Sequence, residues 1–175
     1  MTISTSASAR AAQIVVRRMR AEDWQQARCV RLAALADAPE AFGRTLEEEL
    51  ALSDADWQQR ASDNAIGLKT CGFLAWNGDV PCGLAVGVWI GPGEAELHGM
   101  WVAQNVRRYG TGRALVQAVF AWARDRGARR VSLKVTDGNA AAIALYRANG
   151  FELAQDPQTT CGSREVPALR LQALL

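Results

Sequence analysis

The sequence lacks the residue groupings that build metal centres and disulfide frameworks. It contains four cysteines and one histidine in 175 residues. No two cysteines form a C-x-x-C pair, and His98 has no cysteine or second histidine near it. These absences argue against a zinc site. Because scattered thiols are more typical of a reducing cytosol than of a secreted protein, we expect a cytoplasmic protein without a bound metal.

Long hydrophobic runs are also missing. No apolar segment is long enough to span a bilayer, so we expect no membrane partner. Residues 1–12 are small and polar, without the apolar segment of a signal peptide, and are predicted to form a disordered tail. The remaining residues, 13–175, are predicted to form one globular domain, because 49% hydrophobic and 22% charged residues are ordinary values for such a domain.

No excess of one charge is present, since the net charge is only +2. This balance argues against nonspecific binding of nucleic acid. A nucleic-acid module would have to use four arginines that follow one another closely, Arg124, Arg126, Arg129 and Arg130. No aromatic stacking pattern accompanies them, so we interpret them as a solvated helix end and rank this hypothesis last.

Hydrophobic periodicity and turn residues predict a mixed α/β fold, with a mostly antiparallel central sheet flanked by helices. Asn77-Gly78 and Gly91-Pro92-Gly93 are turn signals that indicate a meander of three strands. A β-α-β pattern follows the meander. The predicted strands are 14–16, 68–76, 82–90, 94–102, 131–135, 151–153 and 168–174, and the predicted helices are 22–36, 45–52, 53–61, 111–126 and 139–149.

The segment from Val102 to Gly112 is expected to connect a strand to the N-terminus of an amphipathic helix. It contains two arginines, Arg107 and Arg108, followed by the glycines Gly110 and Gly112. Free backbone N–H groups and the positive end of the helix dipole make such a place an anion site. We therefore expect a phosphate-bearing ligand at this loop.

Two common phosphate-binding motifs do not fit this loop. A Walker loop needs a Gly-Lys dipeptide, which the sequence does not contain. A Rossmann fingerprint would place its third glycine at Leu115, and Gly110 lies too far beyond the end of the strand at Val102. The pattern that remains is R-x-x-G-x-G over residues 107–112.

A second motif, N-x-x-A-x-x-x-Y-x-x-x-G-F, follows one β-α unit later. Its fixed residues are Asn139, Ala142, Tyr146, Gly150 and Phe151. Together with the loop, it resembles the GNAT superfamily of acyl-CoA-dependent N-acyltransferases, and the resemblance covers residues 94–153. Before Glu94 only the order of the elements supports it.

Two residues of the loop depart from the pattern of the superfamily. Gln104 stands where proline is usual, and Arg108 stands where glycine is usual. Neither substitution removes a backbone donor, because proline has none and arginine keeps its N–H. Arg108 does require a backbone conformation that a non-glycine residue accepts.

The resemblance implies that acetyl-CoA binds with its pyrophosphate on the N–H groups from about Arg108 to Arg113. Glycines would allow a close approach of the backbone to the phosphates. The pantetheine arm would pair with the end of a splayed strand, and Asn139 would contact it. The implied cosubstrate-binding residues are Met100, Trp101, Val102, Arg107, Arg108, Tyr109, Gly110, Thr111, Gly112, Arg113, Asn139 and Tyr146, with no metal.

Direct attack of an amine on the thioester would need a base more than an acid. An alkyl amine has a pKa near 10.4, so deprotonation at pH 7 costs roughly 4–5 kcal/mol, whereas a thiol already leaves well with a pKa near 8.5. The resemblance implies Tyr146 as the acid and Glu96 as the base. His98 is the second candidate base, since imidazole titrates nearer neutrality, and a water chain from either side chain is a third route.

Strand alternation predicts that the candidate bases Glu96 and His98 share one face of their strand with Glu94, Met100 and Val102.

The N-terminal half is expected to form the acceptor site, with Glu40, Phe42 and Trp76 as walls. The sequence thus favours an N-acetyltransferase whose partners are acetyl-CoA and a primary amine of a small molecule or protein. The alternative is a non-catalytic CoA-binding sensor or regulator. A homodimer is also expected, because dimers are common among similar proteins.

Overall fold

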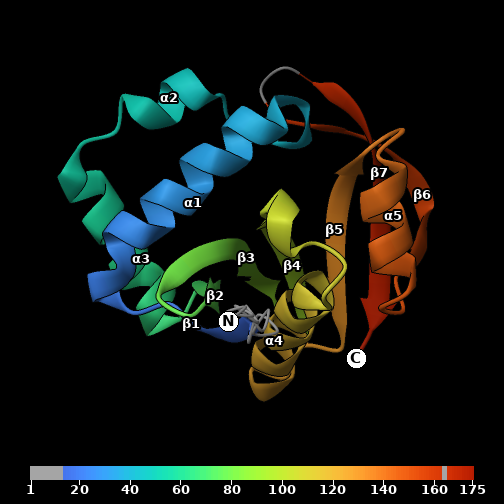
Figure 1. Cartoon of the computed structure of the whole chain (residues 1–175). Helices are drawn as coiled ribbons and strands as arrows, with labels where there is room; N and C mark the ends of the chain where they lie inside the picture. The colour runs from blue at the N-terminus through green and yellow to red at the C-terminus, as the bar shows by residue number, and fades with distance from the viewer. Residues whose placement is uncertain (1–13, 163–164) are drawn as a thin grey trace, which may run out of the picture.

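The chain folds around one seven-stranded sheet with the order β1-β2-β3-β4-β5-β7-β6 (Figure 1). The computed structural model describes residues 14–162 and 165–175, so the predicted tail at residues 1–12 lies outside the described residues. The strands are β1 (Ile14–Arg18), β2 (Thr70–Asn77), β3 (Val80–Gly91), β4 (Glu94–Val102), β5 (Arg130–Thr136), β6 (Glu152–Cys161) and β7 (Val166–Leu174). The helices are α1 (Trp24–Asp37), α2 (Leu46–Leu50), α3 (Asp54–Ile66), α4 (Thr111–Asp125) and α5 (Ala140–Arg147), with short 3-10 turns η1 (Ala21–Asp23), η2 (Pro39–Ala41) and η3 (Gln104–Val106).

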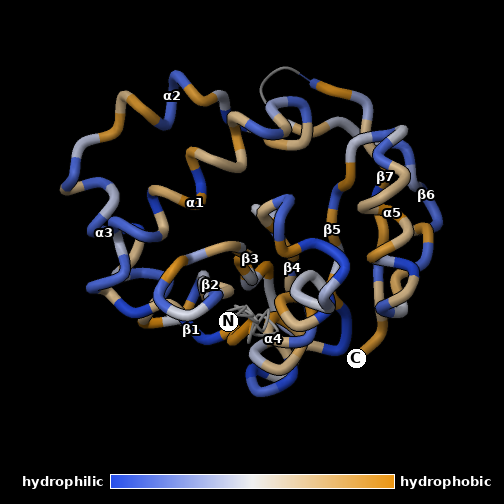
Figure 2. Tube along the Cα trace, viewed as in Figure 1, coloured by the Kyte–Doolittle hydropathy of each residue, from blue (hydrophilic) through white to orange (hydrophobic). Residues whose placement is uncertain are grey.

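The fold class agrees with the prediction from the sequence. All neighbouring strands pair antiparallel except β4 and β5, which are parallel. Helices α4 and α5 cover one face of the sheet, where Leu115, Val116 and Val119 of α4 are fully buried. Helices α1 and α3 cover the other face. Figure 2 shows hydrophobic segments both in the strands and in the helices that cover them. No helix among the described residues has the length and apolar character needed to cross a membrane.

The sheet splits between β4 and β5. These strands pair only where Glu94–Glu96 meet Arg130–Ser132, and Figure 1 shows them separated beyond that point. Backbone N–H and C=O groups on the facing edges are therefore without a strand partner in the split. Because buried backbone groups need hydrogen bonds, the split can accept an extended ligand.

Strand β4 also carries a β-bulge at Gly99. Leu84 of β3 pairs with Trp101, whereas Val86 pairs with His98, so β4 accommodates one extra residue between these pairs. Gly99 has a φ of 62°, in the left-handed region that favours glycine.

The bulge reverses the face of the sheet on which alternate side chains of β4 lie, and so changes the helices that they contact. Before it, His98 lies opposite Val86, whose side chain packs beneath α1. After it, Met100 and Val102 pack against the core beneath α4, and Trp101 packs toward α1. The sequence predicts one shared face for Glu94, Glu96, His98, Met100 and Val102. This prediction is wrong, because the alternation of side chains between the two faces of the sheet is interrupted at the bulge.

Helix α3 and strand β6 exceed their predicted lengths the most. Helix α3 continues to Ile66 and ends at Gly67, which has a left-handed φ of 70°. Strand β6 continues from Leu153 to Cys161 through polar and exposed residues. It lies at the edge of the sheet, and its pairing with β7 is irregular between Leu153 and Gln158, around Pro157. Such an edge strand lacks the alternating pattern that a half-buried strand shows.

Candidate active site

Two cavities meet at the split in the sheet. One has a volume of about 460 Å³ and lies between α1, α3 and the sheet, and the other, of about 1100 Å³, lies along the loop before α4. Both cavities share a small set of lining residues: Ala41, Phe42, Met100, Thr136, Asn139, Ala142 and Tyr146. Two ligands that enter from the two sides would therefore meet beside these residues. We call the smaller space the acceptor cavity and the larger one the loop cavity.

The loop cavity is lined by most of the predicted phosphate-binding segment. Arg107, Arg108, Gly110, Gly112 and Arg113 all line it. Two predicted residues of the segment do not. The hydroxyl of Thr111 is turned inward and donates to the carbonyl oxygen of Val106 at 3.1 Å, and the side chain of Tyr109 is 70% exposed. These two residues could contact a ligand here through their backbone only.

The two glycines of the loop are needed for different reasons. Gly110 is the residue before α4 and has a φ of 82°, and an added Cβ there would meet no atom within 4 Å. A Cβ on Gly112 would lie 3.0 Å from Leu145 Cδ2 and 3.4 Å from Met100 Cε. Gly112 therefore allows α4 to pack closely against α5, in addition to leaving the first N–H groups of α4 open toward the cavity.

Arg108 adopts a left-handed conformation with a φ of 70°, at the position where similar sequences have glycine. This conformation costs a non-glycine residue roughly 1–2 kcal/mol. We expect Arg108→Gly to raise the free energy of unfolding by about 0.5–1 kcal/mol, after the entropy cost of glycine in the unfolded chain. Loss of the guanidinium should at the same time weaken acetyl-CoA binding several-fold. Urea denaturation and acetyl-CoA titration measure the two effects.

Arg108→Ala is the matched control, because it removes the same charge and keeps the strained conformation. It should lose affinity as Arg108→Gly does and gain no stability. Equal stability of the two variants would contradict the strain explanation.

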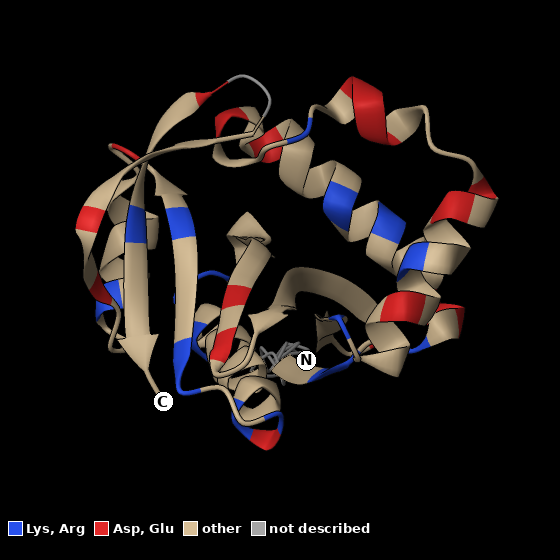
Figure 3. Ribbon diagram, turned by 180° about the vertical axis from the view of Figure 1, so that it is seen from behind, with Lys and Arg blue, Asp and Glu red and all other residues tan. Residues whose placement is uncertain are grey.

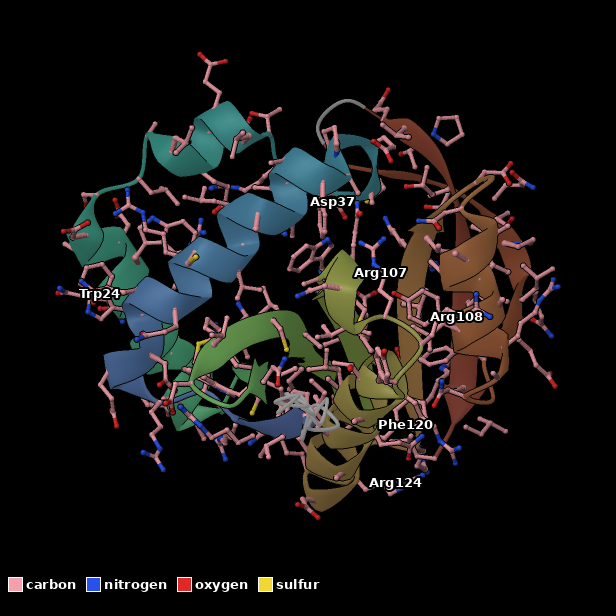
Figure 4. The ribbon with its side chains drawn as sticks, viewed as in Figure 1. Trp24, Asp37, Arg107, Arg108, Phe120 and Arg124 are labelled. Carbon is pink, nitrogen blue, oxygen red and sulfur yellow. The ribbon has the colours of Figure 1, made fainter. Side chains whose placement is uncertain are left out.

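Asp37, the last residue of α1, joins the N-terminal half to the loop. Its carboxylate accepts hydrogen bonds from Trp101 Nε1 at 2.9 Å and from the side chains of Gln104 and Arg107. These three bonds, that of Trp101 above all, lower the pKa of Asp37. Arg107 Nε also donates to the carbonyl oxygen of Val102 at 2.8 Å. Figure 4 shows Arg107 directly below Asp37, and Arg108 turned toward α5.

This network gives a reason for two residues of the loop. Gln104, at the position where proline is usual, donates to Asp37. The charge of Arg107 is neutralised by Asp37, so Arg107 holds the loop in place more than it supplies charge to a phosphate. Arg108 and Arg113 form no ion pair within the described part of the chain, which leaves their charges available in the loop cavity.

Asp37→Asn is expected to weaken acetyl-CoA binding by roughly tenfold. Asparagine loses the charge that Arg107 faces and presents an NH₂ group to donors, and charge-assisted hydrogen bonds are worth about 1.5–3 kcal/mol each. Isothermal titration calorimetry with acetyl-CoA measures the change. Asp125→Asn, at the far end of α4, is the control, and similar affinities of the two variants would show that the network does not shape the loop.

The end of β4 and the start of α5 form the inner part of the loop cavity. Met100, Trp101 and Val102 line it on one side. Asn139 lines both cavities, and its Oδ1 accepts from the backbone N–H of Ala142 at 3.2 Å as the cap of α5. This bond fixes the side chain and leaves the Nδ2 group of Asn139 as a donor.

Tyr146 lies where the two cavities meet and is only 6% exposed. Its ring packs edge-on against Phe151, with ring centroids 5.7 Å apart. Burial raises the pKa of Tyr146, so the phenol stays protonated at neutral pH. Tyr146 is thus a fixed hydrogen-bond donor beside the junction.

Glu96 and His98 form a pair on β4. His98 Nε2 lies 2.8 Å from Glu96 Oε2, and His98 lines the acceptor cavity whereas Glu96 does not. The hydrogen bond from His98 is the main reason why the pKa of Glu96 is lowered, with smaller contributions from Lys134 and Arg170. An ionised carboxylate only accepts, so Nε2 carries the proton and Nδ1 is left as the basic nitrogen.

Two of the three residues that were expected as walls of the acceptor site line a cavity. Phe42 lines both cavities, and Glu40 lines the loop cavity. Trp76 lines neither, because it lies at the end of β2, where its ring packs against the cluster beneath α1 and the guanidinium of Arg17 lies 4.6 Å from the ring centroid. No sequence motif indicates Glu49, which is buried at the wall of the acceptor cavity together with three arginines.

A family model described as "Acetyltransferase (GNAT) family" matches residues 24–151. The chain belongs to this acetyltransferase family. The match confirms the resemblance that the two sequence motifs indicated and extends it to α1. Within residues 14–162 and 165–175, no group of three His, Cys, Asp or Glu side chains is placed to hold a metal ion.

The individual proteins similar to this GNAT protein either share a low sequence identity with it or match it over only part of their length. It is 34% identical over 85 residues to a mycothiol acetyltransferase of Geodermatophilus obscurus, which covers 45% of this chain and only 28% of the relative's length. A ribosomal-protein-alanine N-acetyltransferase from Brucella melitensis has a TM-score of 0.67 and 26% identity, covering 92% of this chain and 99% of its own. A PaiA N-acetyltransferase from Thermoplasma acidophilum, solved with coenzyme A, has a TM-score of 0.69 and 16% identity, covering 93% and 99%.

Proposed function

We propose that the protein transfers an acetyl group from acetyl-CoA to a primary amine, by direct attack within a ternary complex. The observation that carries this proposal is the meeting of two cavities beside Tyr146, one along a phosphate-binding loop and one open to a second ligand. Bound acetyl-CoA supplies the acetyl group as a thioester. The relatives' names refer to different acceptors, mycothiol in one case and a ribosomal-protein alanine in another, so likeness alone leaves the acceptor open.

The loop cavity fits the parts of acetyl-CoA in order. The first N–H groups of α4, with the free charges of Arg108 and Arg113, match a pyrophosphate. The unpaired edge of β4 near Met100–Val102 offers backbone partners to the amide groups of a pantetheine arm. Asn139 can donate to the same arm from the start of α5. This arrangement would direct the thioester toward Tyr146.

His98 is the base that the geometry favours, with Glu96 as its positioning residue. His98 lines the acceptor cavity, so its basic nitrogen can take a proton from the amine directly or through one water. Glu96 holds the imidazole by the 2.8 Å bond and stabilises the imidazolium that forms. The neutral amine that this transfer leaves then attacks the carbonyl carbon, the C–S bond breaks with its electron pair on sulfur, and the extra proton on the new amide nitrogen passes to solvent.

Tyr146 would stabilise the departing sulfur as a hydrogen-bond donor. A phenol with its ordinary pKa near 10 is a weaker acid than a thiol near 8.5, so full proton transfer to the thiolate is uphill by about 2 kcal/mol. Burial raises the pKa of Tyr146 and makes that transfer less favourable still. We therefore assign the phenol the role of donating a hydrogen bond, and the thiolate takes its proton from solvent after release.

Thermal shift and thiol release together test the proposed function. Excess acetyl-CoA should raise the melting temperature, because a ligand that binds only the folded state stabilises it. A panel of primary amines should give amine-dependent release of CoA thiol. Stabilisation without thiol release for any amine would favour the alternative, a CoA-binding sensor, and the absence of both would refute the proposal.

His98→Gln should lower kcat/KM by roughly 10²-fold, and Glu96→Gln by about five- to tenfold. Glu94→Gln, on the same strand but paired with Arg130, is the control, and a kcat/KM of Glu96→Gln equal to that of the control would refute the pairing.

A further inference from the structure

A buried cluster of charges lies on the wall of the acceptor cavity. Glu49 of α2 is 1% exposed, and its carboxylate is 2.6 Å from Arg60 Nη1, 3.5 Å from Arg31 Nη2 and 3.9 Å from Arg44 Nη1. All four residues line the cavity that reaches Tyr146. Three guanidinium groups from different parts of the chain therefore converge on a single carboxylate.

The charges of this cluster do not balance. One carboxylate faces three groups that stay protonated, and Glu49 is the only acid among the described residues that line the cavity. Burial lowers the pKa of Arg31 although Glu49 opposes the shift. Lys134 adds a further cation on the opposite wall. Figure 3 shows basic residues on α1 and on the neighbouring strands β5 and β7.

Aromatic rings hold two of the guanidinium groups in place. Arg31 lies over Phe42 at 4.8 Å from the ring centroid, and Arg60 lies over Trp57 at 5.1 Å. Stacking on a ring fixes the plane of a guanidinium and leaves its edge free to donate. The apolar residues of this wall include Met19, Ala27, Ala61, Leu84 and Val86.

We propose that the acceptor is an amine that also carries a carboxylate, joined to the nitrogen by a short apolar spacer. Its carboxylate would bind Arg31, Arg44 and Arg60, while its nitrogen reaches the junction beside His98 and Tyr146. Arginine forks match the two oxygens of a carboxylate. This inference rests on the proposed acetyl transfer and names the acceptor class for it.

A carboxylate fits the cluster better than a phosphate or a second amine. Arg44 and Arg60 have side chains that are 53% and 37% exposed, so water already screens part of their charge. The positive charge of the cluster that is left uncompensated is therefore nearer to one unit, as a carboxylate carries, than to two. A diamine would place a second cation among the arginines, which like-charge repulsion opposes.

The inference is tested with matched acceptors of increasing length. Thiol release from acetyl-CoA is measured with ω-amino carboxylates, n-alkylamines, α,ω-diamines and ω-aminoalkyl phosphates of equal chain length. At the best length we expect kcat/KM for the amino carboxylate to exceed that of the alkylamine by at least about tenfold, since charged hydrogen bonds are involved. Equal values, or a preference for the diamine or the phosphate, would overturn it.

Arg44→Ala is the variant that assigns the preference to the cluster. Arg44 is the most exposed of the three arginines and the farthest from Glu49, so its loss leaves the buried pair with Arg60 intact. We expect the carboxylate preference, which is the ratio of kcat/KM for the amino carboxylate to kcat/KM for the alkylamine, to fall by about five- to tenfold. Arg28→Ala, also on α1 but paired with Asp54 outside the cavity, is the control. An undiminished preference in Arg44→Ala would refute the assignment.

A binding measurement separates this inference from the proposed function. If no amine supports thiol release, the acetyl-transfer proposal fails, and calorimetric titration of the best-fitting amino carboxylate into the CoA-saturated protein still tests the cluster. Binding that is weakened in Arg44→Ala and not in Arg28→Ala supports the carboxylate site. Binding that is absent, or that is the same in both variants, overturns it.

Discussion

Replacing Tyr146 with phenylalanine is expected to lower kcat by roughly 10²-fold with little change in acetyl-CoA affinity. The substitution removes only the hydroxyl, and a positioned donor that acts mainly on developing charge contributes about this much to a rate. The ring of residue 146 keeps its packing on Phe151, so the melting temperature should stay within a few degrees. Steady-state kinetics of thiol release, with acetyl-CoA titration of the variant, measures both quantities.

Tyr109→Phe is the matched control, because Tyr109 is largely exposed and does not line either cavity. Its kcat should equal that of the unaltered protein. A fall in acetyl-CoA affinity with kcat unchanged in Tyr146→Phe would mean that the phenol only binds acetyl-CoA. No fall in kcat would show that another group stabilises the sulfur.

The second large effect is expected on stability, at Glu49. Glu49→Gln should lower the free energy of unfolding by roughly 3–5 kcal/mol, because it removes the only carboxylate that faces three arginine side chains in a buried place. After the substitution, the partly exposed side chains of Arg44 and Arg60 can turn toward water. The side chain of Arg31 is only 17% exposed and has little room to do so. Urea denaturation followed by circular dichroism measures the loss.

Glu47→Gln on the same helix is the control for this prediction. Glu47 is exposed and in the first turn of α2, so its loss should change stability by less than about 0.5 kcal/mol. A difference below about 1 kcal/mol between the two variants would show that Glu49 does not hold the arginines together.

Features that depend on neighbouring residues in the sequence could be predicted well. The bounds of β4 were predicted to the residue, because turn glycines precede it and the polar loop follows it. Arg107, Arg108, Gly110, Gly112 and Arg113 of the first motif line the loop cavity, and Asn139 of the second motif caps α5. These features depend on local backbone chemistry, which short motifs encode.

Features that depend on distant contacts could not be predicted. Arg31, Glu49 and Arg60 come from three different helices, and no pattern in the sequence shows that they converge. The same holds for Asp37 and Arg107, whose ion pair joins α1 to the loop. Gly99 was a usable signal, because a glycine inside a strand often marks a bulge, and it would have separated Glu96 and His98 from Met100.

The path of the acetyl group tests the account most directly. The protein is incubated with isotope-labelled acetyl-CoA and an amine that supports thiol release, and mass spectrometry then follows the label in both the acceptor and the intact protein. Direct attack at the junction predicts label in an amide of the acceptor and none on the protein at any time. Label that first appears on the protein, for example on Cys161 in the wall of the acceptor cavity, or thiol release without a labelled amide, would contradict the account.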